Sequence, residues 1–316
     1  MTAARVREVT EAAFTWVSAE RHRFVLGDGT LDDPQVVNTT WKPLGELAQV
    51  CSTTLARTAP TDPLHALATD LLEYAWKQTG QGDLLVRQQR REPFATYPLE
   101  VYAAFASAGL RHDGFAALAA QVAGTRGRRL VEQWPVRRLG VLLAERHCGR
   151  RPDGEVAEVL RRTWLGGLPE PWTFERLSGY TLTHVVYHLT DWGRGGPGLP
   201  PDLAGYLELW LPAWLDTCLD AGMWDLSCEL LAVAASLPST SGPAGQEDAW
   251  TALAAARHPT GAVPEEAGGA AAPDDVPDFL GHYHSTLMAA FAGVLALGRL
   301  DGDTTRVPQG RQGAPA

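Results

Sequence analysis

The strongest constraint on the fold is a succession of apolar stretches with helical spacing, which proline and glycine separate from one another. Apolar residues recur at intervals of three and four, as in amphipathic helices, and no stretch shows the strict alternation of a half-buried strand. Alanine-rich and aliphatic runs outnumber β-branched ones, which also favours helix. The pattern predicts an all-α chain of about twelve helices.

The helices expected from this pattern cover residues 3–23, 42–57, 62–78, 99–108, 114–123, 136–147, 154–164, 174–190, 202–221, 225–237, 246–257 and 278–297. Most connections between them are short, which favours antiparallel neighbours. Such pairs can close into an α/α toroid or form an open stack of helical hairpins. Residues 229–237 and 288–298 are nearly uncharged all round, as buried inner helices of a toroid would be, so we expect the toroid.

The chain of 316 residues is long enough for a single domain with a sizeable core, which we expect over residues 1–299, with the functional site between residues 180 and 290. Residues 259–277 are rich in alanine, glycine and proline and predict a flexible surface loop. Residues 300–316 predict a disordered tail.

Composition excludes several classes of protein. A net charge of -10 disfavours binding to nucleic acid, because phosphate backbones repel an acidic surface. The amino-terminal segment lacks the apolar core of a signal peptide, and no run of apolar residues is long enough to span a membrane. The four cysteines have no spacing typical of a disulfide framework, so a cytoplasmic protein is expected.

The segment Thr181 to Gly193 reads TLTHVVYHLTDWG and contains the first candidate site. His184 and His188 lie one helical turn apart on one face, so they could chelate a metal ion. Val185 occupies the position of the catalytic glutamate in the HExxH motif, so a metalloprotease is not indicated. The alternative is a pair of core histidines with backbone partners.

Two neighbours of this pair are catalytic candidates. Asp191 follows His188 by three residues and could orient an imidazole or transfer a proton. Tyr187 adds an aromatic side chain with a polar tip between the two. The isolated histidines elsewhere, which we expect at the surface, are His22, His65, His112, His147 and His258.

A second candidate is the run MWDLSCELL, in which we expect Asp225 to cap a helix that continues through Cys228 and Glu229. A thiol in the first turn of a helix feels the positive end of the dipole, which favours the thiolate of a metal ligand or nucleophile. Glu229 follows directly as a catalytic candidate. The alternative is a capped core helix with a small buried cysteine.

A third candidate is the pair His282 and His284, which cannot face the same way on a regular helix. One of them is therefore expected to point inward. If His284 joins His184, His188 and Cys228, the set is chemically reasonable for zinc, with iron as the alternative.

Asp225, Cys228 and the run Tyr283-His284-Ser285 resemble the zinc ligands of the α/α-toroid protein prenyltransferase β-subunits. Those ligands are an aspartate, a nearby cysteine and a histidine in a Tyr-His-Thr context. The resemblance covers residues 225–298, and the step from aspartate to cysteine is three here rather than two. It implies a zinc site of Asp225, Cys228 and His284. The TH and TDWG letters of residues 183–193 also resemble a family of uncharacterised all-helical actinobacterial proteins.

These observations predict a metal-dependent enzyme, a transferase, lyase or cyclase, that acts on a small-molecule or peptide substrate. The actinobacterial resemblance implies a role in specialised metabolism. No P-loop or GxSxG motif is present, and the GRGGPG run follows a helix rather than a strand, so a nucleotide fold is not indicated. The competing hypothesis is a non-catalytic helical-repeat module that binds a partner peptide in a groove.

Overall fold

The structure, a computed structural model, describes residues 2–27, 37–237 and 246–305. These residues form fourteen α-helices, joined by turns and short 3₁₀ segments, and none of them belongs to a β-strand. The prediction of an all-α chain is therefore confirmed. Within the described ranges, no helix has both the length and the apolar character needed to cross a membrane.

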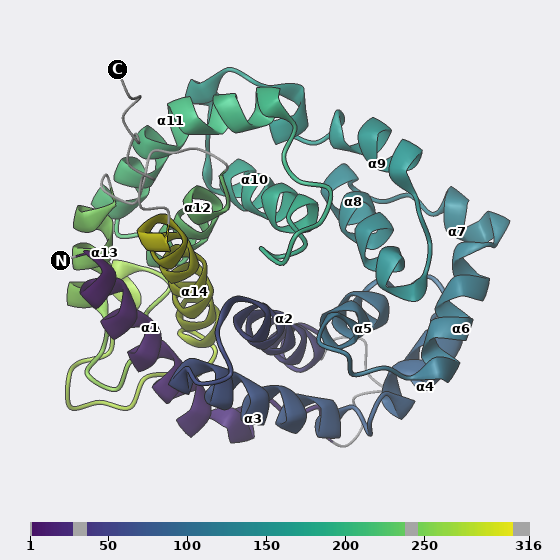
Figure 1. The fold of residues 1–316 in the computed structure, drawn as a ribbon, viewed down its shortest axis with the longest axis horizontal. Coiled ribbons are helices and arrows are strands. Elements are labelled where there is room, and N and C mark those ends of the chain that lie inside the picture. Colours follow the sequence, from purple (N-terminus) through teal and green to yellow (C-terminus); the bar gives the residue numbers. More distant parts are fainter. Residues whose placement is uncertain (1, 28–36, 238–245, 306–316) are drawn as a thin grey trace, which may run out of the picture.

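An inner ring of helices forms the centre of the molecule (Figure 1). Its members are α2 (Trp41–Arg57), α5 (Tyr97–Ser107), α8 (Pro135–Ala144), α10 (Arg176–Leu189), α12 (Trp224–Ser236) and α14 (Tyr283–Thr305). Each inner helix packs against the next, and α14 packs against α2, so the inner helices form a closed circle. Side chains from segments far apart in the sequence therefore meet at the centre.

Outer helices surround this ring. They are α1 (Thr2–Ala19), α3 (Pro63–Gln78), α4 (Asp83–Arg91), α6 (Asp113–Ala123), α7 (Arg126–Leu130), α9 (Asp153–Leu160), α11 (Pro201–Asp220) and α13 (Glu247–Ala256). The 3₁₀ segments include Arg21–Arg23, Glu145–Cys148, Leu165–Gly167, Pro171–Thr173 and Ala267–Gly269. Outer helices pack on inner ones, with α3 on α2, α9 on α8, α11 on α12 and α1 on α14. These four inner helices are therefore covered on their outer sides, which leaves their other sides for the centre.

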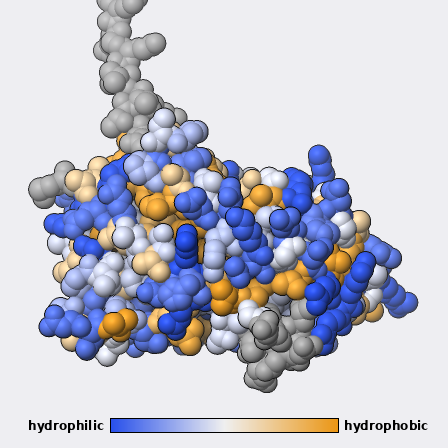
Figure 2. Space-filling view, turned by 90° about the horizontal axis from the view of Figure 1, so that it is seen from below, coloured by the Kyte–Doolittle hydropathy of each residue, from blue (hydrophilic) through white to orange (hydrophobic). Residues whose placement is uncertain are grey.

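The inner helices carry few charged residues because most of their side chains are buried in the core. The side chains of residues 225–234 on α12 and 283–297 on α14 are buried, including Leu230, Val233 and Phe291. Burial of each such side chain contributes roughly 1.5–3 kcal/mol relative to exposure. Hydrophilic residues dominate the side of the molecule shown in Figure 2, with hydrophobic residues in narrower bands between them.

Close packing between α1 and α14 depends on one glycine. A Cβ atom added at Gly293 would lie 1.9 Å from Oγ1 of Thr10, a side chain that is itself fully buried. The hydroxyl of Thr10 already donates a hydrogen bond to the carbonyl of Val6 at 2.7 Å. Only glycine therefore lets the two helices approach this closely.

Several element boundaries differ from the expected ones. Two short basic helices, α4 and α7, were not predicted because nine and five residues are too few to establish a helical period in the sequence. The last helix begins at Tyr283 rather than at residue 278, because Asp278 caps the preceding turn by accepting from the amide of Gly281 at 2.9 Å. It continues to Thr305, into the predicted tail, and residues 306–316 lie outside the described residues.

The segment 259–277 is only partly a surface loop. Residues 261–264 are buried, and a Cβ atom at Gly261 would lie 2.2 Å from the carbonyl oxygen of Ala12. His258, expected at the surface, is buried, and its ring contacts the hydroxyl of Thr260 at 2.8 Å and the carbonyl of Ala272 at 3.0 Å. The expectation for His258 was wrong because this segment folds back onto α1 instead of extending into solvent.

Candidate metal centre

A cavity of about 380 Å³ lies inside the ring, between α2, α5, α8 and α10. Aromatic side chains form much of its wall: Trp41, Tyr97, Trp134, Tyr180 and Trp192. Polar residues from facing helices interrupt this apolar wall. A concave apolar site with a few convergent polar groups is the usual form of a small-molecule site.

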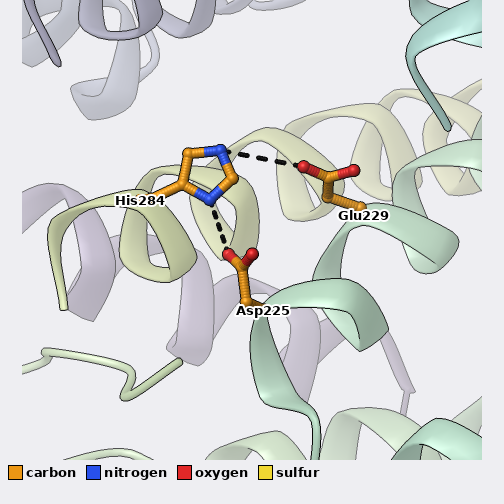
Figure 3. Close-up of side chains that lie close together, drawn as sticks. All are labelled: Asp225, Glu229 and His284. Carbon is orange, nitrogen blue, oxygen red and sulfur yellow. Dashed lines mark hydrogen bonds and ion pairs between the residues drawn. The ribbon is translucent and has the colours of Figure 1, made fainter. Parts of the chain in front are cut away.

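Three buried side chains cluster beside this cavity: Asp225, Glu229 and His284 (Figure 3). Asp225 and Glu229 lie one turn apart on α12, so both project toward α14, which carries His284 in its first turn. Each residue offers one ligand atom, and these atoms all lie within 4.8 Å of one another. The three residues could therefore hold a metal ion.

Asp225 fixes the orientation of the imidazole. Its Oδ1 accepts a hydrogen bond from Nδ1 of His284 at 2.7 Å, and its Oδ2 accepts from the hydroxyl of Tyr180 at 2.7 Å. The other ring nitrogen, Nε2, faces Oε1 of Glu46 at 3.5 Å and Oε1 of Glu229 at 3.7 Å. His284 therefore presents one nitrogen to a carboxylate that orients it and the other to two further carboxylates.

Both glutamates have a buried oxygen without a hydrogen-bond partner. Oε1 of Glu229 and Oε2 of Glu46 accept no hydrogen bond, although Oε2 of Glu229 accepts from the hydroxyl of Thr183. A buried carboxylate oxygen without a donor is costly, by roughly 1–3 kcal/mol. An unpaired oxygen beside an imidazole nitrogen is the arrangement that a bound cation would satisfy.

Burial and mutual attraction determine the charges of this cluster. Burial and the Asp225 carboxylate raise the pKa of Glu229, although His184 and His284 oppose this. Burial alone would raise the pKa of Asp225 too, but His284 and the Tyr180 hydroxyl bring it below its usual value. Burial would lower the pKa of His284, yet the carboxylates of Glu46 and Asp225 raise it to about 10. Without a metal ion, the imidazole therefore carries the compensating positive charge.

His184 and His188 line the cavity but do not enter the cluster. Nδ1 of His184 donates to the carbonyl of Tyr180 at 2.7 Å, which leaves Nε2 as the free nitrogen. The two rings lie 6.2 Å apart between centroids. Burial, with the neighbouring His184 and the positive charge of Arg137, lowers the pKa of His188 to about 3, so this ring stays neutral. In the described part of the chain, neither histidine belongs to a group of three possible ligands.

The expectation of a reactive thiolate at Cys228 was wrong. Helix α12 begins at Trp224 with Met223 as its N-cap, so Asp225 lies inside the helix and Cys228 lies beyond the first turn. The thiol is fully buried, and burial with the carboxylates of Asp225 and Glu229 raises its pKa well above the ordinary value. Of the implied set of Asp225, Cys228 and His284, the structure brings together the aspartate and the histidine.

Asp191 does not orient the histidines of α10. It lies in the turn after α10 in the left-handed region, with a φ of 47°, and Trp192 follows with a φ of 53°. Its carboxylate accepts from Nε2 of His147 at 3.1 Å and from Arg194 at 3.0 Å. Although burial would raise the pKa of Asp191, these two partners hold it well below the usual range. A carboxylate that remains ionised in this way is a poor proton donor.

Tyr187 has a structural contact rather than a place in the cavity wall. It is fully buried, and its hydroxyl donates to the backbone carbonyl of Glu229 at 3.0 Å. Together with Tyr180 and Thr183, it fixes α10 to the cluster-bearing face of α12. Burial and the nearby Glu229 raise its pKa well above the ordinary value.

Sequence reasoning missed three residues of the site: Glu46, Tyr180 and His147. No local motif marks Glu46, which belongs to α2 in the first half of the chain. Tyr180 stands one turn before His184 on α10, so the spacing that selected His184 could also have selected it. His147, expected at the surface, lines the cavity and contacts Asp191.

The fold and the site define an all-α protein in which a ring of helices encloses a cavity, with a buried carboxylate–histidine cluster at its side. The chain belongs to the family described as Domain of unknown function (DUF6895), which matches residues 10–294. The matched region contains Glu46, Asp225, Glu229 and His284. Comparison with curated proteins and with solved structures gave no match.

Proposed function

We propose that this chain is a metal-dependent enzyme that acts on a small-molecule or peptide substrate in the central cavity. Glu46, Glu229 and Nε2 of His284 are the proposed ligands. Asp225 is the residue that orients the imidazole, as carboxylates commonly do for metal-binding histidines. The buried, unpartnered Oε1 of Glu229, which lies 3.7 Å from Nε2 of His284, carries this proposal.

The distances from Nε2 of His284 to each of the two carboxylates fit those between ligands of one ion, although Glu46 lies outside the group of three whose ligand atoms are all within 4.8 Å of one another. Two ligand atoms about 2.1 Å from a common ion, at a tetrahedral angle, are about 3.4 Å apart. The separations from Nε2 to the two carboxylates are 3.5 and 3.7 Å. A direct hydrogen bond from the imidazole to a carboxylate would be shorter, about 2.7–2.9 Å between nitrogen and oxygen. The observed gap is therefore closer to that of co-ligands than to that of hydrogen-bonded partners.

The donor set narrows the choice of metal. One imidazole nitrogen and carboxylate oxygens suit zinc, and they also suit iron(II). Because the thiol of Cys228 is buried in the core, the proposed ligand set contains no thiolate. Zinc remains the preferred ion, with iron as the alternative.

Access from the cavity supports a catalytic rather than a purely structural ion. Glu46 and Tyr180 contribute both to the cavity wall and to the cluster, so a substrate in the cavity would lie next to the ion. A bound ion would supply Lewis-acid chemistry or an activated water. The free Nε2 of His184 is a suitable proton acceptor on the same side. Transfer, elimination and cyclisation are the reaction types that we propose for such a site.

Metal analysis of the purified protein tests the proposal directly. After reconstitution with Zn²⁺ or Fe²⁺ and removal of excess ion, we expect about one ion per chain by elemental analysis. Glu229→Gln and His284→Asn should each lose it, whereas Cys228→Ala should retain it. Absence of a bound ion from the folded wild-type protein under these conditions would overturn the proposal and favour the non-catalytic interaction module.

A further inference from the structure

We propose that the central cavity takes an uncharged, largely apolar small molecule whose hydrogen-bonding group meets His184 and His188. This inference rests on the proposed function in one respect only, that the cavity is the substrate site. It adds the chemical class of the ligand.

The charged groups of the cavity wall are already paired. In the described chain the charged lining residues are Lys42, Glu46, Glu100, Arg137 and Asp191. Lys42 lies 3.8 Å from Glu46, and Arg137 lies 2.5 Å from Glu100. Asp191 is paired with Arg194 at 3.0 Å and with His147. In the metal-free protein a charged ligand would therefore lose hydration without gaining a counter-ion, which is unfavourable.

The rest of the wall is apolar and reaches the surface. Besides its aromatic residues, it includes Val101, Val136 and Leu143. Two lining residues, Trp134 and Leu177, are 67% and 57% exposed, so an apolar path leads outward. The volume of about 380 Å³ falls at the lower end of the range for small-molecule sites. These features select a compact apolar molecule.

The two histidines supply the polar contact. They lie on one face of α10, one turn apart, and both line the cavity. The ring of His184 is fixed by the Tyr180 carbonyl, and that of His188 remains neutral because burial lowers its pKa to about 3. A neutral imidazole such as that of His188 donates to or accepts from a hydroxyl, carbonyl or amide, but it does not neutralise an anion.

Two fluorescent probes with the same aromatic skeleton test the charge preference. N-phenyl-1-naphthylamine is neutral, and 8-anilinonaphthalene-1-sulfonate adds one negative charge to it. On the metal-free full-length protein we expect the neutral probe to bind at about one site per chain, about tenfold more tightly than the sulfonate. Equal or tighter binding of the sulfonate, or no binding of the neutral probe, would overturn the proposal.

A pair of matched variants locates the bound probe. Thr181→Trp fills the cavity from α10, where the threonine hydroxyl only contacts its own helix at Leu177. Thr217→Trp makes the same change on the outer helix α11, at an exposed threonine bonded to the carbonyl of Ala213. Affinity for the neutral probe should fall about tenfold or more in the first variant and stay unchanged in the second.

Unchanged binding in Thr181→Trp, with both variants folded by circular dichroism, would place the probe elsewhere and refute the inference. Because all of these measurements use metal-free protein, they are independent of the metal analysis. A chain that binds the neutral probe but no metal would contradict the proposed function alone.

Discussion

Asp225 and His284 are joined by a hydrogen bond of 2.7 Å on the Nδ1 side of the imidazole, and this bond turns Nε2 toward Glu46 and Glu229. The two residues come from neighbouring inner helices and are 59 positions apart in the chain. Their contact fixes which nitrogen is available to a ligand.

Asp225→Asn should weaken metal binding without abolishing it. The amide keeps the shape of the side chain but loses the negative charge that holds the imidazole, and loss of such a partner costs about 10- to 100-fold in metal affinity. Competition with a chromogenic chelator would measure the change. An affinity equal to that of the wild type would show that Asp225 has no orienting role, and complete loss would make it a ligand.

The stability of the metal-free protein should fall as the pH rises from about 6.5 to 10. The folded pKa of His284 is about 10, above the ordinary value of 6.5, so the folded state holds a proton that the unfolded chain releases. The stabilisation is therefore complete below pH 6.5 and is lost as the pH rises through the folded pKa. It amounts to a few kcal/mol.

Urea unfolding at several pH values, with a chelator present, measures this dependence. His284→Asn should show a flatter profile than the wild type over the same interval, because the proton uptake is missing. Parallel profiles for the two proteins would contradict the assignment of the raised pKa to His284.

Gly293→Ala should destabilise the protein by about 1–3 kcal/mol, because the added methyl group collides with buried Thr10. Helix propensity would favour alanine by only about 0.5–1 kcal/mol, so the collision prevails. Gly298→Ala in the same helix is the matched control, since nothing lies within 4 Å of its added Cβ. Urea denaturation should show the two substitutions with opposite signs, and a stabilising effect at Gly293 would refute the packing argument.

Asp191→Asn should lower stability by about 1–3 kcal/mol and leave the metal content unchanged. Asparagine tolerates the left-handed backbone at this position, but the nearly buried Arg194 would lose its carboxylate partner. Thermal unfolding and elemental analysis of the same sample test both parts. Loss of metal in this variant would restore the orienting role that the sequence predicted for Asp191.

Most helices could be predicted because each buries one face, so that apolar residues recur every three to four positions in the sequence. Helices α4 and α7 were not predicted because nine and five residues are too few for such a period to be recognised. The two helices that are uncharged all round favoured a closed ring over an open stack, but no local pattern in the sequence specifies which helices meet to close it. The contact between α14 and α2 exists only in three dimensions.

The site was predicted in part, for a related reason. Asp225, Glu229 and His284 were predicted because residue types that can bind a metal ion or transfer a proton lie close to expected helix starts. Glu46 looked like any glutamate on an amphipathic helix, and nothing local indicates that its carboxylate faces His284. The prediction for Cys228 was wrong because it depended on the residue at which the helix begins, and α12 begins at Trp224, one residue before Asp225.

The contact of α14 with α2 also determines when the centre can exist during synthesis. A ribosome that has completed α2 and α12 has made Glu46, Asp225 and Glu229, but their imidazole partner emerges only with the final helix. The nascent chain therefore has the three carboxylates without the histidine until α14 packs against α2 and α12. An ion bound by Glu46 and His284 would connect α2 with α14, the first and the last inner helices. Completion of the ring after synthesis would then depend on the supply of metal.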